Sequence, residues 1–226
     1  MDKAEERVAH IRERMEESAS RAGRDVSEIK LAAVTKTRTL EEMLEVAPFV
    51  DALGENRIQE AEPKITCWPS DRPEWRFIGH LQRNKIRRAL TLFDTWDSLD
   101  SAEAALSAER IAEELGRFVP VLIEVNTSGE ASKTGAPPED FSALLDCVTA
   151  CARLKLEGFM TMGPLTDREP LVRSSFAMLR DMGSLARERT GLPLPVLSMG
   201  MSGDFEWAIL EGSTMIRVGT LLFAPR

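Results

Sequence analysis

The chain has 226 residues and a net charge of −8, and its 43% hydrophobic and 29% charged content is ordinary for a globular domain. The acidic balance argues against general nucleic-acid binding and means that any anion site has to be built locally. The N-terminal stretch is charged and does not resemble a signal peptide, and no run approaches the ~20 apolar residues of a membrane span. The three cysteines include no CxxC pair, which suits a reducing cytosol. We therefore expect a cytoplasmic protein with no membrane partner.

An amphipathic helix is predicted over residues 2–22, because Val8, Ile11 and Met15 recur at helical spacing among charges. After it, short apolar strands alternate with helices to the end of the chain. The predicted strands are residues 29–34, 50–53, 75–78, 92–96, 118–125, 155–160, 194–199 and 214–218. The predicted helices between them are residues 40–47, one opening at 54–56, 84–90, 101–115 with Ser101 as its cap, 139–153, 168–190, and one opening at Asp204 with Trp207, Ile209 and Leu210 as its apolar face.

Strict alternation of strand and helix indicates a parallel sheet. Eight such units in about 200 residues fit a closed barrel better than an open sheet. We therefore expect an α/β protein, a single (β/α)8 TIM barrel spanning residues 1–226, with an extra N-terminal helix against its outside.

The C-terminal ends of barrel strands form the functional site. The residues that follow the predicted strands are, in order, Lys36, Asn56, His80, Asp97, Asn126 with Lys133, and the segment from Met160 to Gly163. Lys36 is the most informative, because an amine in a partly desolvated pocket at the end of an apolar strand loses its proton more easily and attacks aldehydes.

The last strand–helix–strand stretch, LSMGMSGDFEWAILEGSTMIRVGT, predicts a phosphate cup. Ser202 and Gly203 lie before a helix start, and Gly219 and Thr220 end the final strand. Free backbone N–H groups and close approach at glycine favour an anion there. Arg217, two residues before Gly219, adds a fixed positive charge. A phosphate cup facing a lysine indicates a ligand with both a phosphate and a carbonyl, such as pyridoxal 5′-phosphate or a keto-sugar phosphate.

Arg217 favours the first of these ligands. Pyridoxal phosphate has a ring nitrogen that needs a partner, and an arginine stays protonated, so it donates to that nitrogen and disfavours its protonation. The ring would then be a poor electron sink.

Seven segments of the sequence resemble those of the pyridoxal phosphate homeostasis proteins: VTKT, GENRIQEAEPKI, WRFIGHLQRNK, WDSLDS, VLIEVNTSGEASKTG, LEGFMTMGPL and LSMGMSGDFEWAILEGSTMIRVGT. The resemblance runs from about residue 30 to the end. It implies a barrel similar to the N-terminal domain of alanine racemase without that enzyme's second β-domain. Two departures are Arg57, where many members have tyrosine, and the tail FAPR; the first bears on contacts near the ring.

The resemblance also implies roles for individual residues. Lys36 carries the cofactor as an aldimine, and Ser202, Gly219 and Thr220 hold its phosphate. Arg217 meets the ring nitrogen. The remaining cofactor-binding residues are expected to be Asn56 and Lys133, the latter being the family's second lysine. The implied function is to hold pyridoxal phosphate for buffering or delivery, without turnover, as a monomer that exchanges the cofactor with dependent apoenzymes or with enzymes that produce it.

Two enzymatic alternatives are weighed against this carrier. An amino-acid racemase needs acid–base groups on both faces of the adduct, and this chain has no tyrosine to serve the second face. A Schiff-base aldolase needs a carboxylate near the lysine, for which Asp97 is the obvious candidate. Other features are expected to be structural: Cys147 and Cys151 as small core residues rather than a metal pair, the basic run at residues 83–88 as a solvated helix face, and His80 as a loop residue.

Overall fold

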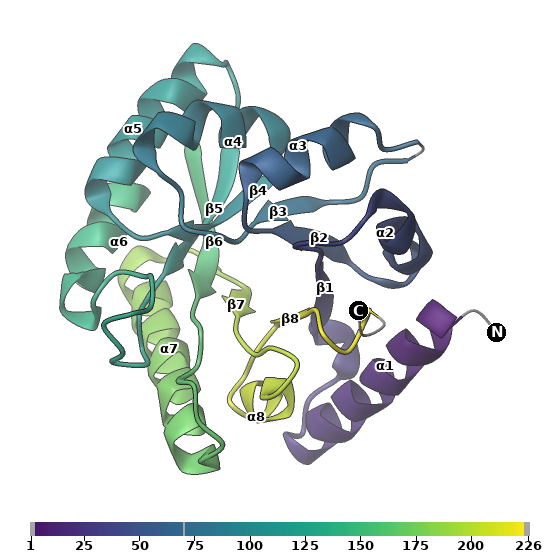
Figure 1. Cartoon of the computed structure of the whole chain (residues 1–226). Coiled ribbons are helices and arrows are strands. Elements are labelled where there is room, and N and C mark those ends of the chain that lie inside the picture. The colour runs from purple at the N-terminus through teal and green to yellow at the C-terminus, as the bar shows by residue number, and fades with distance from the viewer. Residues whose placement is uncertain (1–2, 70, 224–226) are drawn as a thin grey trace.

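Eight parallel strands close into a barrel in chain order in the computed structural model, which describes residues 3–69 and 71–223 (Figure 1). The strands are β1 (Lys30–Val34), β2 (Ala52–Glu55), β3 (Trp75–Phe77), β4 (Thr95–Leu99), β5 (Val119–Glu124), β6 (Leu154–Met160), β7 (Val196–Ser198) and β8 (Met215–Val218). The first and last strands complete the ring, with Ala32 opposite Arg217. The predicted (β/α)8 fold is confirmed, while residue 2 of the predicted first helix and residues 224–226 of the FAPR tail lie outside the described residues.

The helices surround the barrel, and the N-terminal one completes their ring. They are α1 (Lys3–Arg21), α2 (Leu40–Val46), α3 (Ile58–Thr66), α4 (Ile86–Leu92), α5 (Ala102–Glu114), α6 (Phe141–Thr149), α7 (Glu169–Thr190) and α8 (Phe205–Leu210). Helices α2 to α8 each follow a strand, whereas α1 packs between α8 and α2. The predicted apolar stripe of α1, Val8, Ile11 and Met15, is buried against them. This helix therefore fills the place that a helix after β8 takes in a full repeat.

Several predicted boundaries are wrong for identifiable reasons. The fourth strand runs from 95 to 99 rather than 92 to 96, because α4 extends to Leu92. The second strand starts and ends two residues late, because Val50 closes a short 3-10 helix. The seventh begins at Val196, since Leu194 has a positive φ of 38° that an extended strand cannot include.

Two details of the helices also differ from expectation. Ser101 is the first residue before α5, but its side chain makes no capping hydrogen bond. The buried face of α8 consists of Phe205, Ala208 and Ile209, so of the predicted face only Ile209 is buried. A short helix turns one narrow face to the barrel, and its other apolar residues are left half-buried.

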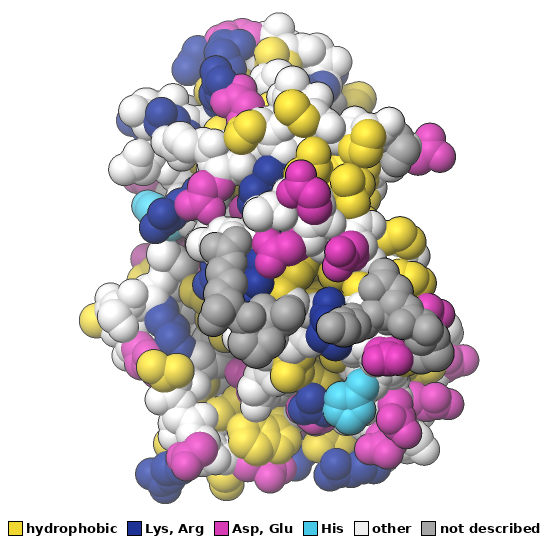
Figure 2. Space-filling model, turned by 45° about the vertical axis from the view of Figure 1, so that its right-hand side comes forward, with side chains coloured by type: hydrophobic (Ala, Val, Ile, Leu, Met, Phe, Trp, Pro, Cys, Tyr) yellow, Lys and Arg dark blue, Asp and Glu magenta, His cyan; other side chains and the backbone are white. Residues whose placement is uncertain are grey.

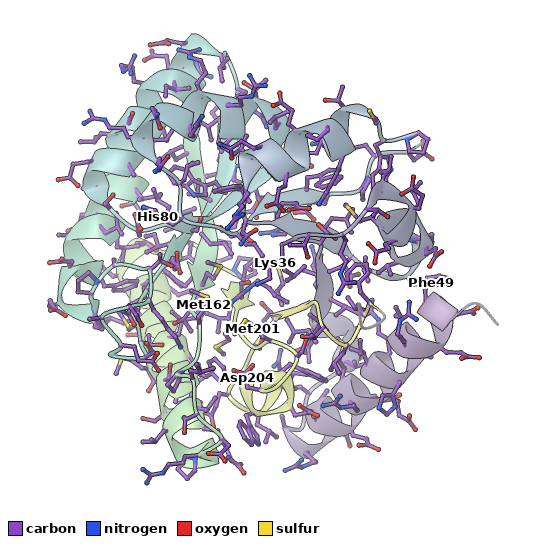
Figure 3. The ribbon with its side chains drawn as sticks, viewed as in Figure 1. Lys36, Phe49, His80, Met162, Met201 and Asp204 are labelled. Carbon is purple, nitrogen blue, oxygen red and sulfur yellow. The ribbon has the colours of Figure 1, made fainter. Side chains whose placement is uncertain are left out.

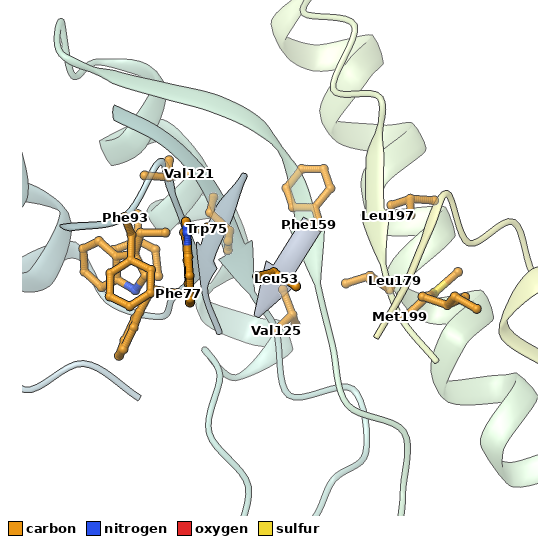
Figure 4. Close-up of a cluster of buried hydrophobic side chains, with 14 of the residues drawn as sticks. Leu53, Trp75, Phe77, Phe93, Val121, Val125, Phe159, Leu179, Leu197 and Met199 are labelled. Atoms are coloured by element: carbon orange, nitrogen blue, oxygen red, sulfur yellow. The ribbon is translucent and has the colours of Figure 1, made fainter. Parts of the chain in front are cut away.

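The apolar core lies mainly between the strands and the helices (Figure 4). Alternate residues of each strand point outward into this layer, among them Leu53, Trp75, Phe77, Val121 and Phe159. The inward residues are smaller or polar. Ala32, Ala52 and Met215 form a separate small cluster. Arg76 and Asp97 are also buried, and Arg76 donates two hydrogen bonds to Asp97, of 2.7 and 3.0 Å.

The outer surface near the two termini carries charges of both signs. Figure 2 shows acidic and basic side chains interspersed there, with no broad basic area on that side. No helix of the described residues is long and apolar enough to cross a membrane.

Candidate functional site

A cavity of about 530 Å³ opens at the C-terminal ends of the strands. Loops after β1, β5, β6 and β7 and the end of β8 line it. Figure 3 shows Lys36, Met162 and Met201 converging there, with Asp204 below them and Phe49 far from the site. The lining residues that were predicted from the sequence are Lys36, Lys133, Ser202, Arg217, Gly219 and Thr220. The fold therefore brings together six of the seven predicted cofactor residues.

The residues of the predicted phosphate cup lie in the loops after β7 and β8. Ser202 Oγ lies 3.4 Å from the backbone nitrogen of Gly219 and 3.3 Å from Thr220 Oγ1, so both loops meet at this hydroxyl. Gly200 makes the approach possible, because it has φ 95° and a Cβ there would lie 2.6 Å from the Ala208 side chain. The cup consists of neutral hydroxyl and N–H donors, which suit a phosphate.

Arg217 reaches into the barrel from β8 and is buried rather than exposed at the surface. One terminal nitrogen donates to Ser198 O and Ser198 Oγ, both at 2.7 Å, and the other donates to Thr161 O at 2.9 Å. Burial lowers the pKa of Arg217, while Asp97 and Glu124 act in the opposite direction. Three of the five guanidinium N–H groups are therefore committed to holding the side chain in place.

Lys36 follows β1 at the rim of the cavity and is exposed. The expectation of a partly desolvated amine is therefore wrong for this structure: the strand ends at Val34, and the lysine lies on the turn beyond it. In residues 3–69 and 71–223 the amine has no hydrogen-bond or ion-pair partner. Lys36 is placed as an accessible amine facing the cup.

Lys133 lines the same cavity from the loop after β5, but its amine is engaged. Its Nζ donates to the carbonyl of Gly163 and lies 3.6 Å from Glu130 Oε2, and the side chain is 17% exposed. Lys133 thus ties the loop after β5 to the loop after β6. Its structural role and its predicted role in cofactor handling involve the same amine.

Asn56 is the predicted residue that does not line this cavity. It borders a neighbouring depression of about 390 Å³ together with Arg57, His80 and Lys85. The helix predicted to open at residues 54–56 begins later, at Ile58, and Arg57 rather than Asn56 occupies its N-cap position. Its Oδ1 is buried without a hydrogen-bond partner in the described part of the chain.

Asp97 lies inside β4 rather than after it, and its carboxylate is buried against Arg76. It is therefore unavailable as the aldolase carboxylate. His80 follows β3 as predicted and is exposed, with Asp100 3.3 Å away. Cys147 and Cys151 pack against the core, and the described residues contain no metal-binding group of three ligands.

Two residues near the site were not anticipated. Asp204 lines the cavity, accepts a hydrogen bond from Met201 N at 2.5 Å, and has its pKa raised by burial. Glu124 ends β5 inside the barrel, where it accepts from Thr134 at 2.7 Å and its other oxygen has no partner among the described residues. A glutamate at the end of the most apolar strand, VPVLIE, was the available signal for the second.

The chain resembles known proteins over nearly its whole length. Residues 7–226 match the family described as "Alanine racemase, N-terminal domain". Proteins named pyridoxal phosphate homeostasis protein share 39% identity over 212 residues in Deinococcus radiodurans (92% of this chain, 95% of that one) and 36% over 222 residues in Aquifex aeolicus (98% and 97%).

Two solved structures extend the comparison. PipY of Synechococcus elongatus, solved with PLP bound, matches with a TM-score of 0.80 and 33% identity over 93% of this chain and all of its own (100%). An alanine racemase of Clostridium difficile matches with a TM-score of 0.75 but 15% identity, over 95% of this chain and 59% of its own. The match with the alanine racemase shows a similar fold and nothing further.

Proposed function

We propose that this chain, which belongs to the family of pyridoxal phosphate homeostasis proteins, binds pyridoxal 5′-phosphate and holds it for intracellular buffering or delivery. The observation that carries this proposal is the single cavity that joins Lys36, the Ser202–Thr220 cup and Arg217. These three elements provide an amine, a phosphate site and a fixed hydrogen-bond donor.

The residues present fit this cofactor. Ser202, Thr220 and the backbone of Gly219 would hold the phosphate, and Arg217, with two N–H groups left after its bonds to Ser198 and Thr161, would donate to the ring nitrogen. When bound, pyridoxal phosphate supplies an aldehyde that condenses with a primary amine with loss of one water. Lys36 is the amine proposed for this role, because Lys133 Nζ is already bonded to Gly163.

Holding without turnover is the proposed mode of action. Arg217 would donate to the ring nitrogen, which would keep a proton off that atom and weaken electron withdrawal by the ring. The chain has no tyrosine, so the acid–base residue expected for the second face of a racemase site is missing. The carrier would act in the cytoplasm as a monomer, with dependent apoenzymes and cofactor-producing enzymes as exchange partners.

The test is reduction of the loaded protein with borohydride, followed by peptide mass spectrometry. The cofactor mass should be fixed on the peptide that contains Lys36. Lys36→Ala should lose it, whereas Lys133→Ala should retain it. Fixation mainly on Lys133 would show that the lysine assignment is wrong, and absence of any cofactor in the wild-type protein would contradict the function itself.

A further inference from the structure

Two side chains of α3, Glu60 and Lys64, reach the turn that carries Lys36. They are one helical turn apart, so they project from the same face of the helix. Lys64 Nζ donates to the carbonyl of Thr35 at 3.0 Å, and Glu60 Oε2 accepts from the backbone N–H of Thr37 at 3.2 Å. The backbone on both sides of Lys36 is therefore held by one helix.

The contact of Lys64 with the turn belongs to a buried hydrogen-bond network. Lys64 Nζ also lies 2.6 Å from Glu55 Oε1, which accepts a second hydrogen bond from Thr35 Oγ1 at 2.8 Å. The Lys64 and Glu55 side chains are 12% and 0% exposed. A buried, hydrogen-bonded ion pair of this kind fixes its groups in one arrangement, unlike a surface pair.

The turn itself adopts a conformation that has to be maintained by its surroundings. Thr37 has φ 63°, in the left-handed region that β-branched residues rarely occupy. Thr35 O accepts a further hydrogen bond from Arg38 N at 3.0 Å, which closes the turn. Since the Lys36 side chain is exposed, its amine is directed toward the cup mainly by the course of this backbone.

We propose that Glu60 and Lys64 are positioning residues for Lys36. They fix its turn so that the amine meets an aldehyde whose phosphate is held at the Ser202–Thr220 cup. Neither residue lines the cavity, so both act through the backbone. This inference rests on the role proposed above for Lys36. It gives the Glu55–Lys64 ion pair a function, to position the turn that carries Lys36, although neither residue lines the cavity.

The experiment separates capture of the aldehyde from binding of the phosphate. The variants are Glu60→Ala, Lys64→Arg, and Lys64→Met combined with Glu55→Gln, which avoids an unpaired buried carboxylate. Glu62→Ala is the matched control, because Glu62 lies on the same helix but pairs with Arg88. Each protein is measured for its rate of pyridoxal phosphate capture, its affinity for pyridoxine 5′-phosphate, which lacks the aldehyde, and amide hydrogen exchange of residues 34–39 without ligand.

Glu60→Ala and the Lys64→Met, Glu55→Gln double variant should capture pyridoxal phosphate about tenfold more slowly than the wild type. Their affinity for pyridoxine 5′-phosphate should stay within about twofold of the wild-type value, because a small misplacement of a reacting group affects the reaction and not the binding of the phosphate. Exchange in residues 34–39 should become faster. Lys64→Arg should recover most of the capture rate, and Glu62→Ala should behave as the wild type.

Unchanged capture despite faster exchange would overturn the proposal. A parallel fall in capture, phosphate affinity and melting temperature would overturn it as well, since that pattern belongs to a merely structural pair. If the double variant at the buried pair does not fold, Glu60→Ala alone tests the proposal, because Glu60 is partly exposed and its removal leaves no buried charge unpaired. Failure of the proposed function is a separate result: the wild type would then fix no cofactor on Lys36, whatever the exchange data show.

Discussion

Gly219 lies just beyond β8 and lines the cavity, and a side chain at this position would be crowded. A Cβ at this position would lie 3.3 Å from Val34 O and 3.4 Å from Val34 Cβ, which leaves little room. Gly219→Val should therefore weaken binding of pyridoxal phosphate by about tenfold or more, since the cup loses close backbone approach. Equilibrium titration of the visible absorbance measures this.

Pyridoxal without its phosphate is the control ligand for that experiment. Its reaction with the protein does not use the cup, so it should proceed equally with the Gly219→Val variant and the wild type. An equal loss with both ligands would place the phosphate elsewhere.

Glu124 makes stability depend on pH. Burial raises its pKa to about 7, against the opposing effects of the Thr134 hydrogen bond and the Arg217 charge. Between the unfolded value of 4.5 and about 7, the folded protein keeps a proton that the unfolded chain releases. The stabilisation from this group is therefore fully present below the unfolded value and falls by up to about 1.4 kcal/mol per pH unit as the pH rises toward 7.

Glu124→Gln should remove this dependence, because an amide does not titrate. Urea unfolding of the cofactor-free wild type and variant from pH 4.5 to 8 gives the difference directly. A difference in the free energy of unfolding that stays constant over this range would mean that Glu124 is already ionised in the folded protein.

At the level of elements, β3 and β4 are joined across the barrel interior by Arg76 and Asp97. The pair is buried, with Thr95 adding a hydrogen bond to the carboxylate at 2.9 Å. Asp97→Asn should lower the free energy of unfolding by about 3 kcal/mol, since the buried guanidinium would lose its fully buried counterion and keep only the partly exposed Glu74. Chemical denaturation measures the change.

An exposed ion pair provides the comparison. Arg88→Ala removes a surface contact with Glu62 and should cost less than about 1 kcal/mol. Replacing both buried partners, Arg76→Met with Asp97→Leu, should recover most of the loss. A double variant as unstable as Asp97→Asn would mean that the pair contributes specific strand packing rather than charge balance.

The sequence allowed the order of the elements to be predicted better than their limits. Alternating apolar segments identified all eight strands, because the layer between strands and helices is apolar. The fourth strand was displaced since it contains polar residues: Thr95, Asp97 and Ser98 are all buried, while Leu92 and Phe93 belong to the end of α4. Hydrophobicity alone does not distinguish an inward polar residue from an exposed one.

The candidate site was predictable where its residues lie in one local motif. Ser202, Arg217, Gly219 and Thr220 come from a single stretch and line the same cavity. Long-range contacts were not predictable: the bonds of Arg217 to Thr161 and of Lys64 to Thr35 join segments 56 and 29 residues apart. The exposure of Lys36 was missed because it depends on where the turn after β1 leads.

For the whole molecule, the carrier proposal predicts very slow chemistry on amino acids. A positioned proton donor or acceptor contributes about 10²–10⁴-fold, and the chain has no tyrosine to provide one on the face opposite Lys36. The holo-protein incubated with L-alanine in deuterated water should show little α-proton exchange and no D-alanine. Proton NMR and chiral chromatography follow the two quantities, with the Lys36→Ala protein as the background.

Exchange at enzyme-like rates that disappears in the Lys36→Ala protein would favour the racemase. Exchange that persists in that variant would instead reflect free cofactor in solution. The two outcomes are separable because only the first requires the lysine.

The pairing of β1 with β8 has a consequence for biosynthesis. Lys36 is translated before Ser202, Gly219 and Thr220, and these residues share one cavity only when β8 closes the ring. A nascent chain on the ribosome that has not yet released β8 has the amine proposed to bind the aldehyde but not the complete phosphate site proposed for the cofactor. Binding of pyridoxal phosphate is therefore expected to follow translation. A chain on a ribosome that is stalled before residue 215 should not retain pyridoxal phosphate.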